Sequence, residues 1–324
     1  MDTLPIDTSH PAVRDYLALI RLQVLTPLSL LLNIATLLVC ALIASPSIAG
    51  VAHLYPTAIT PKIGIIEAYI FLIWLTQIGY CVLLVAARKP ETKATLIKGV
   101  GLALPIANLL LSLWAIAWIM KWFLAATIFV GCILLVLLYS NTVLLVYHAP
   151  DYSSRPFDAL LIHAPMRFFL VLPLSILFAL SLFITLHMNY EPTPTGPPPN
   201  YSAWHAGAGA GVVAGSNVLA LLVVVLRRDL VWCVAAVWVN VSLWSSRVQP
   251  PAGVNITAIL FTAILPLALI AAFVYNRFCS GERTGRIRLI GEERTSSTPN
   301  LVNRGNAQAP IDNTGPREVD DTWG

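Results

Sequence analysis

Residues 148–167 contain the side chains best suited to acid–base chemistry. Two histidines, two aspartates and two arginines at a membrane surface could catalyse acyl or phosphoryl transfer on lipid headgroups. Their spacing matches no metal-binding or catalytic-triad motif. A solvated loop, with His163 and Arg167 anchoring the start of the next helix, is the interpretation that the sequence favours, so we lean against an enzyme and assign no catalytic residue. The six residues are His148, Asp151, Arg155, Asp158, His163 and Arg167.

The remaining histidines that could bind a metal lie far apart in the sequence. His53, His187 and His205 fall in three separate connecting segments on the other side of the predicted membrane. A shared metal ion would need all three segments to converge. We therefore predict no metal site and no cofactor.

Several tryptophans fall deep inside apolar stretches. Trp114 and Trp118 are four residues apart and share a helix face, and Trp74 is also deep. Aromatic rings at such positions pack a protein core or wall an apolar ligand pocket. We predict a ligand-binding pocket formed by Trp74, Trp114, Trp118 and Asn108, with core packing as the alternative. Trp122, Trp204, Trp232 and Trp244 fall near the predicted membrane interfaces, as an aromatic belt does.

The polar residues within the apolar stretches are mostly amides. No Asp, Lys or Arg is predicted at mid-depth, and Glu67 lies at the start of its stretch. This pattern argues against proton pumps and ion-coupled transporters, which usually need ionisable groups inside the membrane. The amides either bond helix to helix or contact a ligand, because lipid offers no hydrogen bonds. They are Asn33, Gln77, Asn108, Asn141, Asn217 and Asn240.

Glycines recur every fourth residue at Gly207, Gly211 and Gly215. This spacing places them on one helix face, where another backbone can approach closely. Packing against a neighbouring helix of the same chain is the simpler interpretation. Homodimerisation through this face is the alternative.

The elements that position these residues are apolar stretches long enough to cross a membrane. Hydrophobic residues make up 57% of the chain and charged residues 11%, and a spanning helix needs about 20 apolar residues. The sequence thus predicts an all-α membrane bundle of about eight helices, of which 230–246 is the least secure span. The predicted spans are 22–44, 65–86, 99–120, 123–147, 167–187, 205–226, 230–246 and 253–275.

Basic residues are distributed unequally between the two sides of these spans. Lys62, Lys121 and Arg247 fall on one side and the other seventeen of the twenty Lys and Arg residues on the opposite side. Because basic loops stay in the cytosol, both termini are predicted to be cytosolic. The same loops account for the net charge of +4, so nucleic-acid binding is not expected.

The chain divides into three parts: a cytosolic segment 1–21, a transmembrane domain 22–276 and a polar tail 277–324, which we expect to be disordered. Membrane lipids are the expected surroundings of the middle part. The sequence does not indicate an organelle.

Part of the chain resembles a known family. Ile59-Thr60-Pro61, Trp74, Gln77-Ile78-Gly79-Tyr80 and Trp114-Ala115-Ile116-Ala117-Trp118 resemble patterns of the tryptophan-rich sensory/translocator protein family (TspO). The resemblance implies a five-helix core over about 22–190, although Leu111 stands where that family has an asparagine. Ala87 to Lys93 and Arg227 to Trp232 more closely resemble uncharacterised fungal multi-pass membrane proteins, which implies no activity.

Three functions remain open. The leading hypothesis is binding or movement of a small apolar ligand, such as a lipid, sterol or tetrapyrrole, in the tryptophan pocket. The second is a lipid-modifying enzyme that uses the 148–167 loop. The third is a non-catalytic membrane scaffold that associates through the glycine face.

Overall fold

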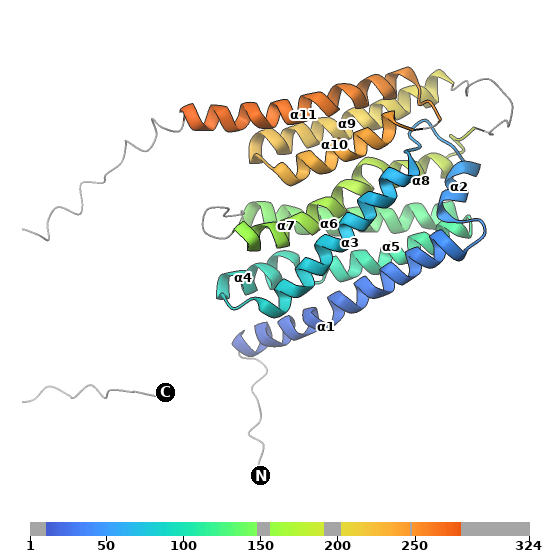
Figure 1. The fold of residues 1–324 in the computed structure, drawn as a ribbon. Coiled ribbons are helices and arrows are strands. Elements are labelled where there is room, and N and C mark those ends of the chain that lie inside the picture. The colour runs from blue at the N-terminus through green and yellow to red at the C-terminus, as the bar shows by residue number, and fades with distance from the viewer. Residues whose placement is uncertain (1–10, 148–155, 191–201, 247, 280–324) are drawn as a thin grey trace, which may run out of the picture. The chain divides into compact units, whose positions relative to one another are not determined.

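A computed structural model describes residues 11–147, 156–190, 202–246 and 248–279 (Figure 1). These residues form an all-α bundle without a β-strand, and one isolated bridge pairs Thr57 with Asn189. The predicted fold class, an all-α membrane helix bundle, is confirmed. Met1–Arg277 form one compact unit. The predicted disordered tail lies outside the described residues from position 280 onward.

The bundle contains α-helices and three π-helical turns, labelled η. In chain order they are α1 (Pro11–Leu38), η1 (Val39–Ile43), α2 (Ile48–Leu54), α3 (Ile63–Ala86), α4 (Pro90–Ala94), η2 (Thr95–Val100), α5 (Ala103–Ile119), α6 (Phe123–Tyr147), α7 (Pro156–Leu172), η3 (Pro173–Leu177), α8 (Phe178–Thr185), α9 (Ala203–Arg227), α10 (Leu230–Trp244) and α11 (Ala252–Cys279).

Six helices among the described residues are long and apolar enough to cross a membrane. A seventh is obtained if Pro90–Val100 and Ala103–Ile119, which are bent by 40° at their junction, are taken as one span. The bend falls at Gly101, whose positive φ of 50° suits glycine. α10 is apolar but shorter. The predicted total of eight spans therefore stays a prediction.

Two helices extend well beyond the apolar spans predicted for them. α1 begins at Pro11, before the predicted span 22–44, so part of the predicted N-terminal segment is helical. α7 begins at Pro156, before the predicted span 167–187. In both places the helix continues through charged residues that lie outside the predicted span.

The continuous span from α7 through η3 to α8 is the central element of the bundle. In the most apolar part of Leu160–Thr185, 78% of the residues are buried, compared with 22–33% in the other five long spans. Pro173 begins the π-helical turn η3. Because proline has no N–H to donate, it interrupts the regular hydrogen-bond ladder here.

The three C-terminal helices lie together along one side of the bundle (Figure 1). α10 packs against α7 and α3. Asn217 of α9 and Asn240 of α10 donate reciprocally through Nδ2 to each other's Oδ1, at 2.9 and 2.7 Å. This paired amide bond fixes the facing positions of the two helices.

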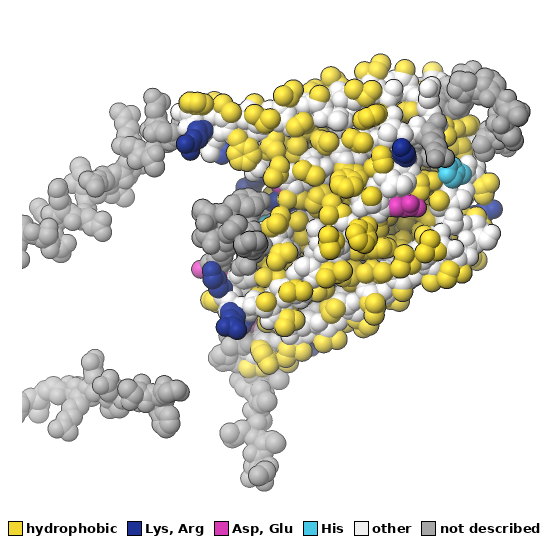
Figure 2. Space-filling model, viewed as in Figure 1, with side chains coloured by type: hydrophobic (Ala, Val, Ile, Leu, Met, Phe, Trp, Pro, Cys, Tyr) yellow, Lys and Arg dark blue, Asp and Glu magenta, His cyan; other side chains and the backbone are white. Residues whose placement is uncertain are grey.

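The outer surface of the helices is apolar. Figure 2 shows hydrophobic side chains along the length of the bundle and charged side chains mostly toward its ends. Such a surface suits hydrocarbon rather than water. Trp122, Trp204 and Trp244 are exposed, as the predicted belt requires, whereas Trp232 is buried at the start of α10 and does not belong to it.

Candidate ligand pocket

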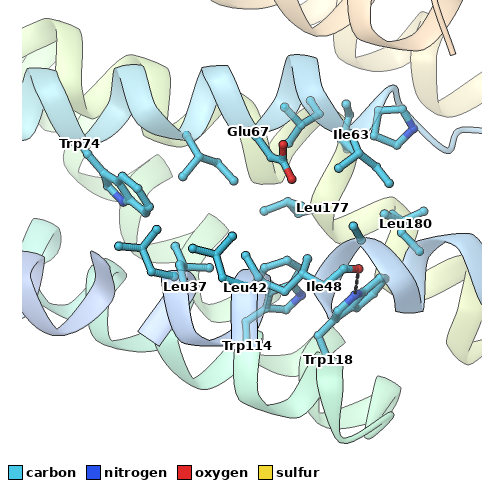
Figure 3. Close-up of a pocket in the computed structure, with 18 residues that line it drawn as sticks. Leu37, Leu42, Ile48, Ile63, Glu67, Trp74, Trp114, Trp118, Leu177 and Leu180 are labelled. Atoms are coloured by element: carbon cyan, nitrogen blue, oxygen red, sulfur yellow. Dashed lines mark hydrogen bonds between the residues drawn. The ribbon is translucent and has the colours of Figure 1, made fainter. Parts of the chain in front are cut away.

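A pocket of about 280 Å³ lies among α1, η1, α2, α3, α5, η3 and α8 (Figure 3). Trp74, Trp114 and Trp118, predicted to share a ligand site, all line it. The lining residues are Leu37, Leu38, Ala41, Leu42, Ile48, Ala49, Ala52, Pro61, Ile63, Ile66, Glu67, Ile70, Trp74, Trp114, Trp118, Ile176, Leu177 and Leu180. The structure thus brings the three tryptophans to one cavity, while ligand binding by them stays a prediction.

Each tryptophan in the pocket uses its indole N–H within the protein. Trp74 Nε1 donates to Asn33 Oδ1 at 3.1 Å, and Trp118 Nε1 donates to the Ile48 carbonyl at 3.2 Å. Trp114 Nε1 makes a longer bond of 3.4 Å to Ser181 Oγ. Since the donors are satisfied by the protein, the rings present apolar surface to the cavity.

Trp114 and Trp118 also form part of the core. Their ring centroids lie 5.5 Å apart, and Phe123 packs edge-on against Trp118 at 5.7 Å. Trp118 is only 1% exposed. The two predicted alternatives, core packing and pocket wall, therefore hold together for this pair.

Asn108 is not among the residues that line this pocket, so ligand contact by Asn108 stays a prediction. Its Nδ2 donates to Gln77 Oε1 at 2.7 Å, and its backbone carbonyl accepts from Asn33 Nδ2 at 3.0 Å. Asn33 in turn accepts the Trp74 indole N–H. Asn108 therefore positions Trp74 through Asn33.

All six predicted mid-helix amides bond to another helix, which confirms the helix-to-helix interpretation. Asn33, Gln77 and Asn108 join α1, α3 and α5. Asn141 Nδ2 reaches the Met166 carbonyl at 3.2 Å, and the Asn217–Asn240 pair completes the set. Such bonds stabilise membrane bundles by roughly 0.6 kcal/mol each on average.

The mouth of the pocket lies between η1 and α3. Leu38 and Leu42 on the first side are 42% and 79% exposed, and Glu67 on the second is also exposed. The inner wall, including Trp118 and Ile176, is fully buried. The cavity is therefore open to the outer surface of the bundle at this rim.

The sequence did not reveal three of the elements that shape this pocket. The residues of α2 fall in the connection between two predicted spans, so no helix was expected there. Its start is marked by Ser47, whose Oγ accepts from Gly50 N at 3.1 Å, a helix cap that the sequence could have indicated. The turns η1 and η3 leave no recognisable local pattern, although π-helical turns often occur beside functional sites.

A more polar pocket of about 420 Å³ adjoins the first one. The two share Ala49, Ala52, Pro61 and Ile63 in their linings. The polar side chains of the second pocket belong to His53, Thr60, Lys62, Tyr190 and Ser246. An apolar cavity thus passes into a polar one at this end of α3.

The stretch 148–167 was expected to be a solvated loop, with His163 and Arg167 anchoring the start of the next helix. In the structure both residues are buried inside α7, which begins at Pro156, so that expectation is wrong for these two residues. Arg167 Nε lies 2.8 Å from Asp229 Oδ2, with both side chains at most 2% exposed. His148, Asp151 and Arg155 lie outside the described residues.

Asp229 makes two interactions at the start of α10. Its Oδ1 accepts from Trp232 N at 3.1 Å and caps the helix, while its other oxygen faces Arg167. Burial raises the pKa of the Asp229 carboxyl, and the Arg167 guanidinium and backbone N–H groups oppose this only in part. The ion pair thus joins α7 to the start of α10.

The predicted glycine face is open. A methyl group built at Gly207, Gly211 or Gly215 would meet nothing within 4 Å, so no helix among the described residues packs there. The close approach occurs instead at Gly209. A Cβ built there would lie 3.0 Å from the Cβ of Ala58 and 3.1 Å from the Cγ2 of Val254. Packing within the chain is therefore not the explanation of the glycine face, and association between copies stays a prediction.

Within the described ranges, no three His, Cys, Asp or Glu side chains are grouped to hold a metal ion. Comparison with protein families, curated proteins and solved structures finds no match to this chain.

Proposed function

We propose that this membrane protein binds a small apolar ligand between α1, α3 and α5 and moves it laterally between the pocket and the bilayer. One observation carries the proposal: three tryptophans from two helices line a cavity that is open at an exposed, mostly apolar rim on the surface of the bundle. A pocket with aromatic walls and few polar groups is the usual form of a small-molecule site.

The surroundings of the pocket support this proposal. The rings of Trp74 and Trp118 are each held by a hydrogen bond at the side. A preformed wall loses little conformational freedom when a ligand enters. The pocket also lies within the region that resembles the translocator family, although a shared fold would not by itself establish a shared ligand.

We further propose that the chain crosses the membrane eight times with both termini in the cytosol. This count takes α4, η2 and α5 as one broken span and includes the short helix α10. The unequal distribution of Lys and Arg supports the orientation. The pocket mouth and Lys62 would then lie toward the non-cytosolic side.

The proposal is tested by filling the cavity. Ala41→Phe places a ring in the lining, whereas Ala68→Phe adds the same ring at an exposed position of α3 that does not line the pocket. We expect saturable binding of tritiated 1-adamantylmethanol, a compact apolar probe, in phosphatidylcholine nanodiscs. Ala41→Phe should weaken that binding by about tenfold or more, as loss of roughly 1.4 kcal/mol would.

The control variant should bind like the native protein. Equal loss in both variants would indicate a general effect of added bulk. Full binding by Ala41→Phe, in a protein that elutes as a single species, would place the ligand elsewhere and overturn the proposal.

A further inference from the structure

The chemistry of the pocket lining restricts the kind of ligand that it can take. Among the eighteen described lining residues, seventeen are aliphatic side chains or tryptophans, and Glu67 is the one ionisable residue. A single charge at an otherwise apolar site decides the orientation and class of the ligand.

The other polar groups of the lining side chains are already used. The indole N–H groups of Trp74, Trp114 and Trp118 donate to Asn33, Ser181 and Ile48 respectively. The Glu67 carboxylate therefore remains as the side-chain group of the lining that can meet a polar part of a ligand. It is an acceptor when ionised, so it calls for a donor or a cation.

Glu67 is free to take that role. No ion pair or hydrogen bond joins its carboxylate to another side chain of the described residues. Figure 3 shows the carboxylate directed from α3 into the pocket, above Leu177. Lys62 is the nearest cation in sequence, yet it lines the neighbouring polar pocket instead.

The position of Glu67 along α3 keeps its charge tolerable. It is the fifth residue of a helix that begins at Ile63, which places it roughly 6 Å from the helix start at 1.5 Å per residue. A carboxylate near a helix end can reach the interface, where the cost of ionisation is far below that at mid-membrane.

The start of α3 is held firmly by α10. Lys62 N donates to the Ser242 carbonyl at 2.7 Å, and Trp238 Nε1 donates to the Ile65 carbonyl at 3.0 Å. Both bonds attach to backbone groups within the five residues that precede Glu67. The carboxylate is therefore presented from a fixed backbone at the pocket mouth.

We propose that the ligand is a compact amphiphile with an apolar body and a cationic head, such as a protonated amine. The body occupies the cavity between the tryptophans, and the ammonium pairs with Glu67 at the mouth. This inference rests on the proposed function and adds the ligand class to it. The volume of about 280 Å³ favours a compact body over a long acyl chain.

The inference is tested with three probes that share one apolar body: 1-adamantylmethylamine, 1-adamantylmethanol and 1-adamantanecarboxylate. Each is tritiated, and saturable binding is measured by scintillation proximity on protein in phosphatidylcholine nanodiscs, with empty nanodiscs as blank. We expect the amine to bind about tenfold more tightly than the alcohol, the size of one charge-assisted contact. The carboxylate should bind most weakly.

Two variants locate the charge. Glu67→Gln keeps the shape of an exposed side chain and should bring the amine down to the affinity of the alcohol, while alcohol binding is retained. Lys62→Gln, the matched control five residues away, should leave the preference for the amine in place.

The outcomes separate the two proposals. Equal binding of amine and alcohol, or a preference that survives Glu67→Gln, overturns the cationic head and leaves the apolar pocket standing. A preference for the carboxylate that Lys62→Gln abolishes also overturns it, in favour of an anionic head in the polar pocket. Absence of saturable binding by every probe would instead count against the proposed function itself.

Discussion

At the scale of single residues, the buried ion pair is the feature with the clearest energetic consequence. Arg167 and Asp229 lie 2.8 Å apart inside the bundle. Burying two charges costs several kcal/mol per ion before their attraction is counted. Removal of either partner takes this ion pair away from the other, but only Asp229 can become neutral, by taking up a proton.

Asp229→Asn should destabilise the protein more than Arg167→Met does. The first variant keeps the helix cap but leaves a guanidinium that cannot lose its proton, at a cost of about 3–5 kcal/mol. The second leaves a carboxyl that can take up a proton. The double variant should recover much of the loss, since no charge then remains buried. Thermal unfolding in detergent measures the order.

The pH dependence of Arg167→Met follows from the same argument. Burial raises the pKa of Asp229 above its unfolded value, so the native state holds the proton more tightly than the unfolded state. Stability should therefore rise as the pH falls through the raised pKa and be lost as the pH increases. Equal losses in the two single variants, together with a flat pH profile, would contradict this account of the pair.

The surroundings of some of these residues could be predicted from the sequence, and those of others could not. Trp114 and Trp118 were predictable as neighbours because helical spacing alone puts them on one face. Arg167 was placed at a helix end because an unpaired charge inside a membrane is costly. Its partner Asp229 lies sixty-two positions away, and only the folded chain reveals that the charge is compensated.

At the scale of elements, α9 presents two glycine faces with opposite surroundings. Gly209 is pressed against the segment before α3 and against α11, whereas Gly211 faces open space. Four-residue periodicity predicted the face of Gly207, Gly211 and Gly215 as the packed one. Periodicity identifies residues on a common face but cannot tell which face meets the rest of the chain.

Gly209→Val should therefore destabilise the protein and Gly211→Val should not. Valine at position 209 forces contacts that are already too close for a methyl group, with a typical overpacking cost of about 1–3 kcal/mol. Unfolding temperature in detergent distinguishes the two variants. Chemical crosslinking of Gly211→Leu in membranes tests the predicted homodimer, and unchanged crosslinking would exclude that face as its interface.

The remaining difference between expectation and structure at this scale concerns π-helical turns and short helices. η1 and η3 border the pocket, and α2 closes one end of it. Apolar stretches that continue through a π-helical turn look like regular helix in the sequence, because hydrophobicity alone does not record the extra residue per turn. The pocket shape was therefore not predictable, although its tryptophans were.

At the scale of the whole molecule, the bundle combines a central buried span with helices that expose apolar surface outward. Leu160–Thr185 is the central span, and the pocket lies between its η3 and α8 part and the helices α1, α2, α3 and α5. The fold class was predictable from composition and segment length, because few structures other than a helix bundle satisfy the backbone hydrogen bonds of such long apolar segments inside a membrane. The number of crossings was not predictable in this way. Pro90–Val100 and Ala103–Ile119 are bent by 40° at their junction, and they add a crossing only if the two are taken together as one span.

An apolar molecule should occupy this cavity in a saturable way. Photolabelling in nanodiscs with an adamantyl diazirine, followed by peptide mapping with and without excess unlabelled 1-adamantylmethanol, measures this occupancy. We predict that competitor suppresses labelling of segments 37–52, 61–74 and 176–180, which line the pocket, and leaves labelling of the exposed face of α6 unchanged. Labelling of the pocket segments that no excess of competitor reduces would contradict the claim.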